Sequence, residues 1–150
     1  MRRMLAPLLL LLTSCTNTAP ASHAVPAVEL HGQRFSIEFA TDNASREHGL
    51  MMRNTLAADH GMLFVFPDTA NRGFWMKNTL IPLDILYFDT DYRLVSMQLD
   101  VPPCKADPCP TYPSNAAARY VLELSAGTAH RIGAKVGDTL KIEGDAGTAR

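Results

Sequence analysis

The clearest pattern in the chain is the alternation of apolar and polar residues in the segment QRFSIEFA. Phe35, Ile37 and Phe39 fall on one face of an extended chain, and the residues between them fall on the other. A period of two is typical of a half-buried strand. The dipeptide at 31–32, His-Gly, predicts a turn that connects this strand to a short one over 28–30.

Further apolar runs, each ended by proline, glycine or aspartate-rich turns, predict strands over 62–66, 73–76, 83–88, 94–101, 119–124 and the end of VGDTLKIEG. The N-capping residues TDN predict a helix within 44–56, and AGTAHRIGA predicts a second short helix. Gly49 disfavours a long first helix, because glycine costs about 1 kcal/mol relative to alanine. The pattern predicts a single strand-dominated α+β domain of about seven strands, in a mixed sheet or small barrel-like arrangement, with two short helices.

The N-terminal segment MRRMLAPLLLLLTSC has the layout of a bacterial secretory signal: two arginines, an apolar run and small residues. It is too short to span a membrane as a mature helix. The residues LTSC resemble the lipobox of bacterial lipoproteins, which implies that Cys15 is acylated and that residues 1–14 are a signal peptide that is removed. An ordinary cleaved signal peptide is the alternative. Residues 15–26 are small and polar and predict a disordered tether.

This organisation leaves residues 27–143 as one folded domain and 144–150 as a disordered tail. The expected partner of the anchored chain is a membrane, at its periplasmic face. Thr16, in place of aspartate after the lipid-bearing cysteine, favours the outer membrane under the sorting rules of lipoproteins. The protein partner is left open.

Three cysteines are an odd number for an exported chain, and acylation of Cys15 explains the unpaired one. Cys104 and Cys109 are then free to form a disulfide in an oxidising compartment. The enclosed loop is short, so the bridge is expected to stabilise the fold by only about 2 kcal/mol. A metal pair is the alternative, although structural zinc sites use four ligands at narrower spacing.

Charge excludes one class of function. The full chain has 14 basic and 15 acidic residues, a net charge of −1, and removing Arg2 and Arg3 with the signal peptide makes it −3. No basic stripe is present, so the sequence gives no argument for nucleic-acid binding. No cofactor is predicted.

Several motifs carry a family resemblance: SREHGLMMR, HGMLFVFP, FWMKNTLIPLDILYFD, the tyrosine of PTYPS (Tyr112), and YVLELSAGTAHRIGAKVGDTLKI. In this order they resemble the family called domain of unknown function 192, over nearly the whole folded region. The resemblance implies a small β-rich domain, often exported or lipid-anchored, and it implies no activity. The loop containing Cys104 and Cys109 is longer and richer in proline than the family pattern.

Candidate binding residues surround the stretch FWMKNT. Trp75, Lys77 and Asn78 combine a flat aromatic surface with hydrogen-bond donors, which suits a sugar ring or an anionic ligand. The alternative is a core tryptophan beside a turn. Arg46 and Arg53 are seven residues apart, so a helix would present both on one face, either to an anion or simply to solvent.

Two carboxylates lie in apolar surroundings and need partners if they are buried. Glu123 lies in YVLEL and Asp84 precedes the apolar run ILYF. We expect both to meet Arg46, Arg53 and Lys77 in one polar cluster. Such a cluster would carry surplus positive charge for an anion or acidic sugar.

The favoured interpretation is therefore a cell-envelope lipoprotein that binds a small anionic or saccharide ligand or has an accessory role. Two alternatives remain. The first is an enzyme that acts on an envelope saccharide with Glu123 and Asp84 as acid and base. The second is a periplasmic copper-handling protein using thioether and imidazole ligands, drawn from His48, Met51, Met52, His60, Met62 and Met76. For these residues, ordinary core packing is favoured over a metal site.

Overall fold

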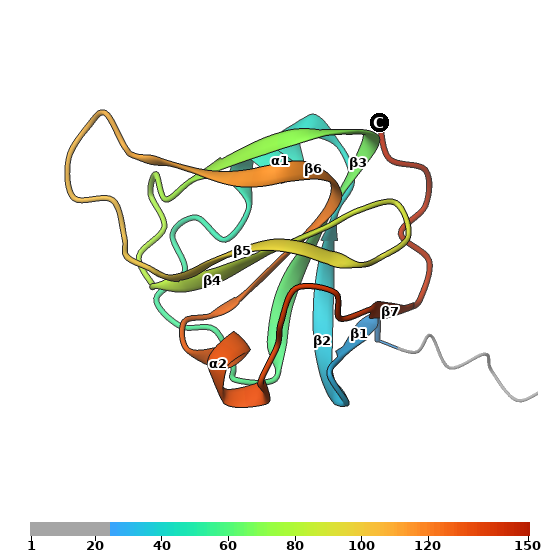
Figure 1. Ribbon diagram of the computed structural model, residues 1–150. Helices are drawn as coiled ribbons and strands as arrows, with labels where there is room; N and C mark the ends of the chain where they lie inside the picture. The colour runs from blue at the N-terminus through green and yellow to red at the C-terminus, as the bar shows by residue number, and fades with distance from the viewer. Residues whose placement is uncertain (1–24) are drawn as a thin grey trace, which may run out of the picture.

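The computed structural model describes residues 25–150 (Figure 1). The signal peptide, Cys15 and most of the tether therefore lie outside the described residues. The secondary-structure elements are β1 (Ala27–Leu30), β2 (Gln33–Ala40), α1 (Asn43–His48), β3 (His60–Trp75), β4 (Leu83–Phe88), β5 (Leu94–Val101), β6 (Thr111–Ser125), α2 (Thr128–Ile132) and β7 (Leu140–Glu143). None of the helices in this part of the chain has the length and apolar character needed to cross a membrane.

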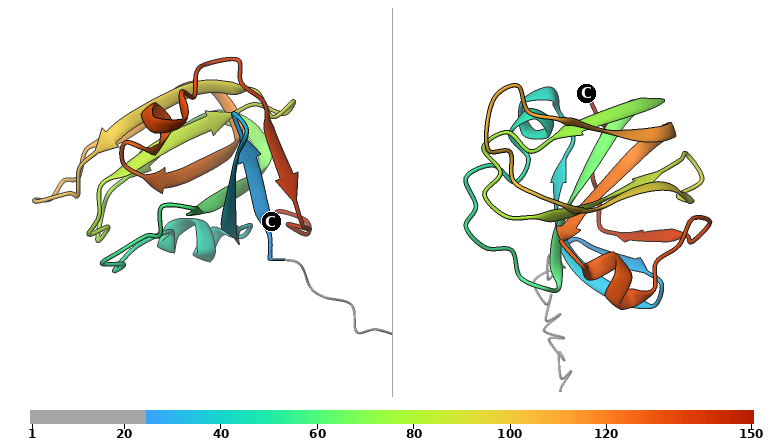
Figure 2. Two further views of the ribbon diagram at one scale, coloured as in Figure 1. Left: turned by 90° about the horizontal axis from the view of Figure 1, so that it is seen from below. Right: turned by 60° about the vertical axis from the view of Figure 1, so that its left-hand side comes forward.

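The strands form one mixed seven-stranded sheet in the order β5-β4-β6-β3-β2-β1-β7. β2 and β3 pair in parallel, and all other neighbours are antiparallel. The sheet curls into a half-barrel, and a single bridge between Arg93 and Thr139 brings its two edges together (Figure 2). This confirms the predicted strand-dominated α+β domain with two short helices.

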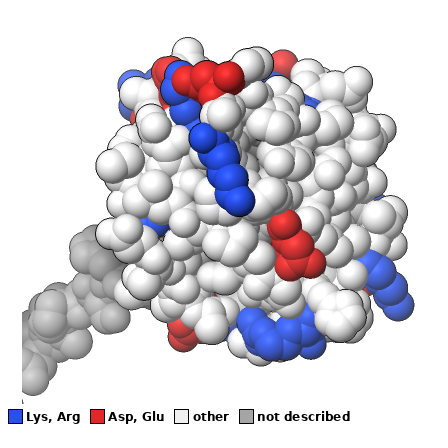
Figure 3. Space-filling model, turned by 90° about the vertical axis from the view of Figure 1, so that its left-hand side faces the viewer, with Lys and Arg blue, Asp and Glu red and all other residues white. Residues whose placement is uncertain are grey.

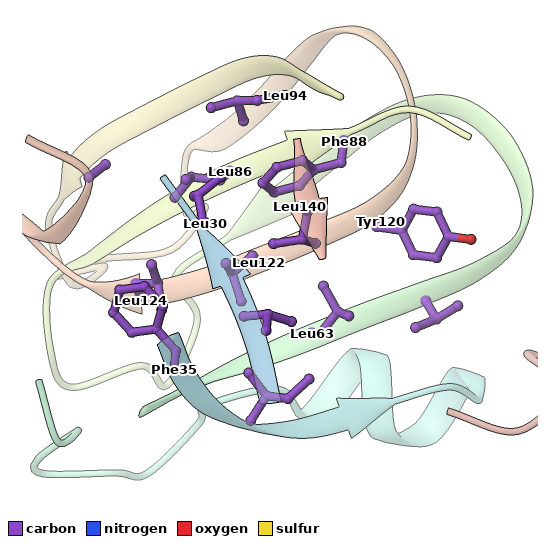
Figure 4. Close-up of a cluster of buried hydrophobic side chains, with 14 residues drawn as sticks. Leu30, Phe35, Leu63, Leu86, Phe88, Leu94, Tyr120, Leu122, Leu124 and Leu140 are labelled. Carbon is purple, nitrogen blue, oxygen red and sulfur yellow. The ribbon is translucent and has the colours of Figure 1, made fainter. Parts of the chain in front are cut away.

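The concave face of the sheet holds the larger hydrophobic core (Figure 4). Alternate residues of each strand point into it, as the period-two pattern predicts. Figure 4 shows Leu63, Leu122 and Leu124 from the central strands meeting Phe35 and Leu30 from β2 and β1. Burial of these side chains against each other closes the curled sheet.

The opposite face of the central strands carries a second core. Here Phe64, Ile85 and Val121 are covered by residues from outside the sheet, including Leu50 after α1 and Met76 after β3. Both covering residues are almost fully buried. The segments that follow α1 and β3 are therefore packed parts of the domain, and they border the candidate site.

The structure corrects two predicted element boundaries. The helix predicted within 44–56 ends at His48, because Gly49 takes a positive φ of 47° and caps it. The two strands predicted over 62–66 and 73–76 are one strand, β3, with irregular pairing to β6 between them. The Arg72 side chain supports the irregular stretch by donating hydrogen bonds to the carbonyl oxygens of Ala118 and Asp68.

The loop between β5 and β6, at the left of Figure 1, contains the predicted Cys104–Cys109 disulfide. At the other end of the molecule, residues 144–150 run back along the domain. Ala146 and Ala149 pack against the larger core, and the backbone N–H of Arg150 donates to the carbonyl oxygen of Thr41.

Candidate functional site

The predicted residues Trp75, Lys77 and Asn78 lie together in a surface cleft beside α1. This outer cleft has a volume of about 360 Å³, and it is lined by Ala44, Glu47, His48, Met51, Trp75, Lys77 and Asn78. A neighbouring hollow of about 240 Å³ shares Lys77 and Asn78 and reaches the disulfide loop at Lys105 and Asp107. The cleft thus extends from the helix to the disulfide loop.

A narrow inner pocket adjoins the outer cleft and shares four of its lining residues, Glu47, His48, Met51 and Trp75. Its volume of about 30 Å³ holds one small chemical group. The remaining lining residues are Arg46, Gly49, Leu50, Phe64, Phe74, Thr79 and Glu123. A larger cavity of about 520 Å³ lies under the segment 144–149 and includes none of the predicted site residues.

Local structure explains why these side chains meet. Asp42 caps α1 by accepting a hydrogen bond from the backbone N–H of Ser45, 2.9 Å away, and Gly49 ends the helix after two turns. The chain then turns back, and the backbone N–H of Met52 donates to the carbonyl oxygen of Asn78 at 2.8 Å. Asn78 adopts a positive φ of 54°, a conformation that asparagine tolerates better than most residues. The hydrogen bond between Met52 and Asn78 holds the segment after α1 against the turn that follows β3.

Trp75 lines the outer cleft and keeps 44% of its surface exposed. The Lys77 ammonium lies over its ring, 5.4 Å from the centroid. This arrangement answers why a lysine and an asparagine interrupt the apolar run of FWMKNTLIPLD. The strand ends at Trp75, and both polar residues belong to the turn at the rim of the cleft.

Glu123 lies on β6 between Met62 of β3 and Ile85 of β4. Only 4% of its surface is exposed, at the wall of the inner pocket. Burial raises its pKa to about 8, and no hydrogen bond or cation among the described residues opposes this effect. Desolvation, followed by the charge of Glu123, also raises the pKa of Tyr87 on β4. Glu123 is therefore mainly protonated at neutral pH.

The predicted polar cluster is wrong. Arg53 lies beyond the helix, where its two terminal nitrogens bind the Glu38 carboxylate at 2.6 and 2.7 Å. Arg46 instead donates to the carbonyl oxygen of Val65 and to Asn43. The early helix end at Gly49 explains the error, because a helix would be needed to place both arginines on one face.

Asp84 is also separate from Glu123. It pairs with Leu124, which faces the larger core, whereas Glu123 faces the second core on the opposite side of the sheet. Asp84 is fully buried and accepts hydrogen bonds from the backbone N–H groups of Asp100 and Ala129 at 2.9 and 2.8 Å. Its carboxylate thus attaches the first turn of α2 to the end of β5.

Tyr112 lies at the start of β6 and packs against the second core, where its carbonyl oxygen accepts a hydrogen bond from the Tyr87 hydroxyl at 2.7 Å. It lines neither the outer cleft nor the inner pocket. In contrast, Glu47 and Thr79 line the site without having been predicted. No helical spacing places Glu47 beside Met51, because α1 ends at His48 and Met51 follows the glycine that ends the helix.

The residues considered as copper ligands are dispersed. His60 binds Ser36 and Glu38, and Met62 and Met76 are buried in the second core. His48 and Met51 remain together in the outer cleft. Within residues 25–150, no group of three histidine, cysteine or acidic side chains is placed to hold a metal ion.

The charges on the face turned toward the viewer in Figure 3 are sparse and of both signs. This view shows the side of the molecule that is at the left of Figure 1. Basic and acidic side chains lie against one another at the top of this view and are elsewhere separated by neutral surface, so this face lacks the continuous positive stripe of a nucleic-acid-binding surface.

The family model DUF192, described as "Uncharacterized ACR", matches residues 26–142. A crystal structure of a protein from Sinorhizobium meliloti 1021, described as a proposed transcription regulator, is 38% identical, with a TM-score of 0.71. The match covers 83% of this chain and 98% of the other. A protein of unknown function from Novosphingobium aromaticivorans DSM 12444 is 31% identical, also with a TM-score of 0.71, over 77% of this chain and 83% of the other. No curated protein matches the chain significantly.

Proposed function

The chain belongs to the DUF192 family, and we propose that it is a lipid-anchored cell-envelope protein that binds a small saccharide ligand in the outer cleft. The observation that carries this proposal is the partly exposed Trp75 in a cleft that is also lined by polar side chains. Aromatic rings pack against the apolar face of a sugar ring, while polar groups at the edge bind its hydroxyls.

The polar rim suits hydroxyl recognition. Asn78 offers both a donor and an acceptor, and Lys77 and His48 add donors at the same rim. An acidic saccharide is also compatible, because Lys77 and Lys105 lie along the extended cleft. The surplus positive charge that the sequence predicted is absent, however, since Arg53 is neutralised by Glu38. A neutral saccharide is therefore favoured over an anion.

Catalysis is less well supported than binding. Glycoside hydrolysis uses two carboxyl groups that flank one bond. Glu123 and Asp84 cannot form such a pair, because they lie on opposite faces of the sheet. Transcription regulation, suggested by the description of the relative from S. meliloti, is not favoured by a chain whose net charge is −1.

The N-terminal sequence supports a proposal for the location of the protein. We propose that residues 1–14 are removed as a signal peptide, that Cys15 carries the lipid, and that Thr16 directs the protein to the periplasmic face of the outer membrane. Intact-mass measurement of the protein purified from membranes tests this. The expected mass lacks residues 1–14 and includes acyl chains on Cys15, whereas a mature chain that begins elsewhere would exclude the anchor.

A thermal-shift screen of the protein against neutral saccharides, acidic saccharides, inorganic anions and Cu(I) tests the binding site. A ligand at 100 times its dissociation constant stabilises the folded state by about 2.7 kcal/mol, which raises the melting temperature by several degrees. The shift for a neutral saccharide should disappear in Trp75→Ala and persist in Asp91→Asn, which removes an exposed carboxylate in the distant turn between β4 and β5. Equal shifts in both variants would contradict a site over Trp75.

A further inference from the structure

The inner pocket contains a combination that the binding of sugar hydroxyls does not require. Glu123 is a buried carboxyl group that receives no hydrogen bond from the described residues. Around it, the pocket is lined by the aromatic residues Phe64, Phe74 and Trp75 and by Met51. A carboxylate among aromatic rings is the composition of sites that bind organic cations, because the ring faces and the carboxylate both attract positive charge.

The charged groups near Glu123 leave room for a cation. On α1, Arg46 brings one positive charge to the pocket wall, where its terminal N–H groups donate to oxygens of Val65, Asn43 and Arg150, while Glu47 adds a second acidic group to the pocket. His48 is the remaining titratable residue that lines the pocket, and Tyr87 on β4 titrates far above neutral pH. No lysine is among the residues that line the inner pocket.

We propose that the inner pocket binds the ammonium group of an amine-bearing saccharide, with Glu123 as its counter-ion. This inference rests on the proposed function, because the sugar ring is placed over Trp75 in the outer cleft. The two cavities share Trp75, Met51, His48 and Glu47, so one ligand can occupy both. The pocket volume of about 30 Å³ matches a single ammonium group and is too small for a sugar ring.

The chain already contains an example of this recognition. The Lys77 ammonium lies 5.4 Å from the centroid of the Trp75 ring, in the geometry of a cation–π contact. An anion in the inner pocket would meet Arg46, but also Glu47 and the ionised form of Glu123, so two acidic groups would oppose one cation. A hydroxyl group could hydrogen-bond the protonated carboxyl group, but it offers no charge partner to the ionised form. An ammonium group satisfies both the carboxylate and the aromatic rings.

The affinity for an ammonium group should depend on pH. The cation binds the ionised form of Glu123, so binding releases the carboxyl proton to water. Since the pKa of Glu123 is about 8, its ionised fraction rises about tenfold from pH 6 to pH 7. The affinity for the amine should rise by about the same factor. A ligand without an amine should show no such increase.

The experiment follows the fluorescence of Trp75, the single tryptophan of the chain, during titration of the full-length protein. Four probes are compared at pH 6 and pH 7: glucose, N-acetylglucosamine, glucosamine and ethylammonium chloride. We expect glucosamine to bind at least tenfold more tightly than glucose at pH 7, and N-acetylglucosamine, in which the amine is blocked, to resemble glucose. Glu123→Gln should remove this preference and its pH dependence, and Asp91→Asn should keep both.

The outcomes separate this inference from the proposed function. If glucose and glucosamine bind equally, with no pH dependence, the ammonium pocket is overturned and the saccharide site stands. If ethylammonium binds in a Glu123-dependent manner while no sugar adds affinity, the ammonium pocket stands and the saccharide function fails. If no probe changes the Trp75 fluorescence, both are overturned. Should Glu123→Gln fail to fold, the pH dependence is measured in His48→Gln, which removes the other group of the pocket that can titrate near neutral pH. A tenfold rise that persists there supports Glu123 as the counter-ion, and its loss overturns the proposal.

Discussion

Replacing Glu123 by glutamine should stabilise the protein at neutral pH, contrary to the usual effect of a core substitution. The pKa of Glu123 is raised from 4.5 to about 8, so the folded state holds a proton that the unfolded state releases between these values. Stability is therefore fully present below pH 4.5 and declines as the pH rises toward 8, by about 1.4 kcal/mol for each pH unit. Glutamine has the shape of the protonated side chain and does not ionise.

The magnitude follows from this window. Between pH 4.5 and pH 7, ionisation of Glu123 lowers the free energy of unfolding of the unaltered protein by about 3 kcal/mol. Glu123→Gln has no such group and should not show this decrease. Urea denaturation of both proteins at pH 5, 6, 7 and 8 measures the difference in the free energy of unfolding. The two should nearly coincide at pH 5 and diverge steadily above it, while Asp91→Asn should follow the unaltered protein. Parallel curves would show that burial does not raise the pKa of Glu123, and a variant that loses stability relative to the unaltered protein as the pH rises would show that Glu123 has an ionic partner. Either result would refute the reasoning.

Three further predictions concern residues outside the site. Glu38→Gln should lower the free energy of unfolding by about 1 kcal/mol at pH 7 in urea denaturation. The loss is small because the Glu38 side chain is 43% exposed, and the difference from the unaltered protein should vanish in acid. The cause is the low pKa of Glu38, about 2, set mainly by its bond to Arg53, so its contribution is present above pH 4.5 and lost as the pH falls toward 2. Asp84→Asn should lower the free energy of unfolding by about 2 kcal/mol in chemical denaturation, because an amide oxygen can replace only one of the two carboxylate oxygens that accept backbone N–H groups. An unchanged free energy of unfolding would show that one of these hydrogen bonds is dispensable. Reduction of the Cys104–Cys109 bridge should cost about 2 kcal/mol or less, and unfolding on reduction would contradict a local role for this short loop.

The fold could be predicted from the sequence because its strands obey a local rule. Alternation in QRFSIEFA places Phe35 and Ile37 in the larger core, as the pattern indicates. Glycine and proline end the elements where the chain turns, so the positions of most strands follow from neighbouring residues alone. β3 is the exception, because Pro67 and Gly73 resemble strand ends. The long strand continues through them with the support of Arg72, which binds a carbonyl oxygen 46 residues away.

The candidate site was predictable only where its residues are close in sequence. Trp75 ends β3, Lys77 and Asn78 belong to the turn that follows it, and the structure brings the three together. The contact between this turn and α1 depends on a backbone hydrogen bond from Met52 to Asn78, which no local pattern encodes. The faces of Asp84 and Glu123 depend on the register of β4 and β6. A shift of one residue would reverse the face of either side chain, so their separation could not be derived without the pairing.

The pH dependence of stability and the proposed binding of an ammonium group have the same physical origin. An unpartnered carboxyl group in the second core destabilises the fold near neutral pH, because the unfolded chain ionises it freely. A bound cation would make the ionised form acceptable in the folded state and would recover much of that loss. The thermal shift caused by an amine should therefore grow from pH 5 to pH 7, as the penalty that it relieves becomes larger. A carboxyl group retained only for packing would show the loss of stability with pH but no such growth.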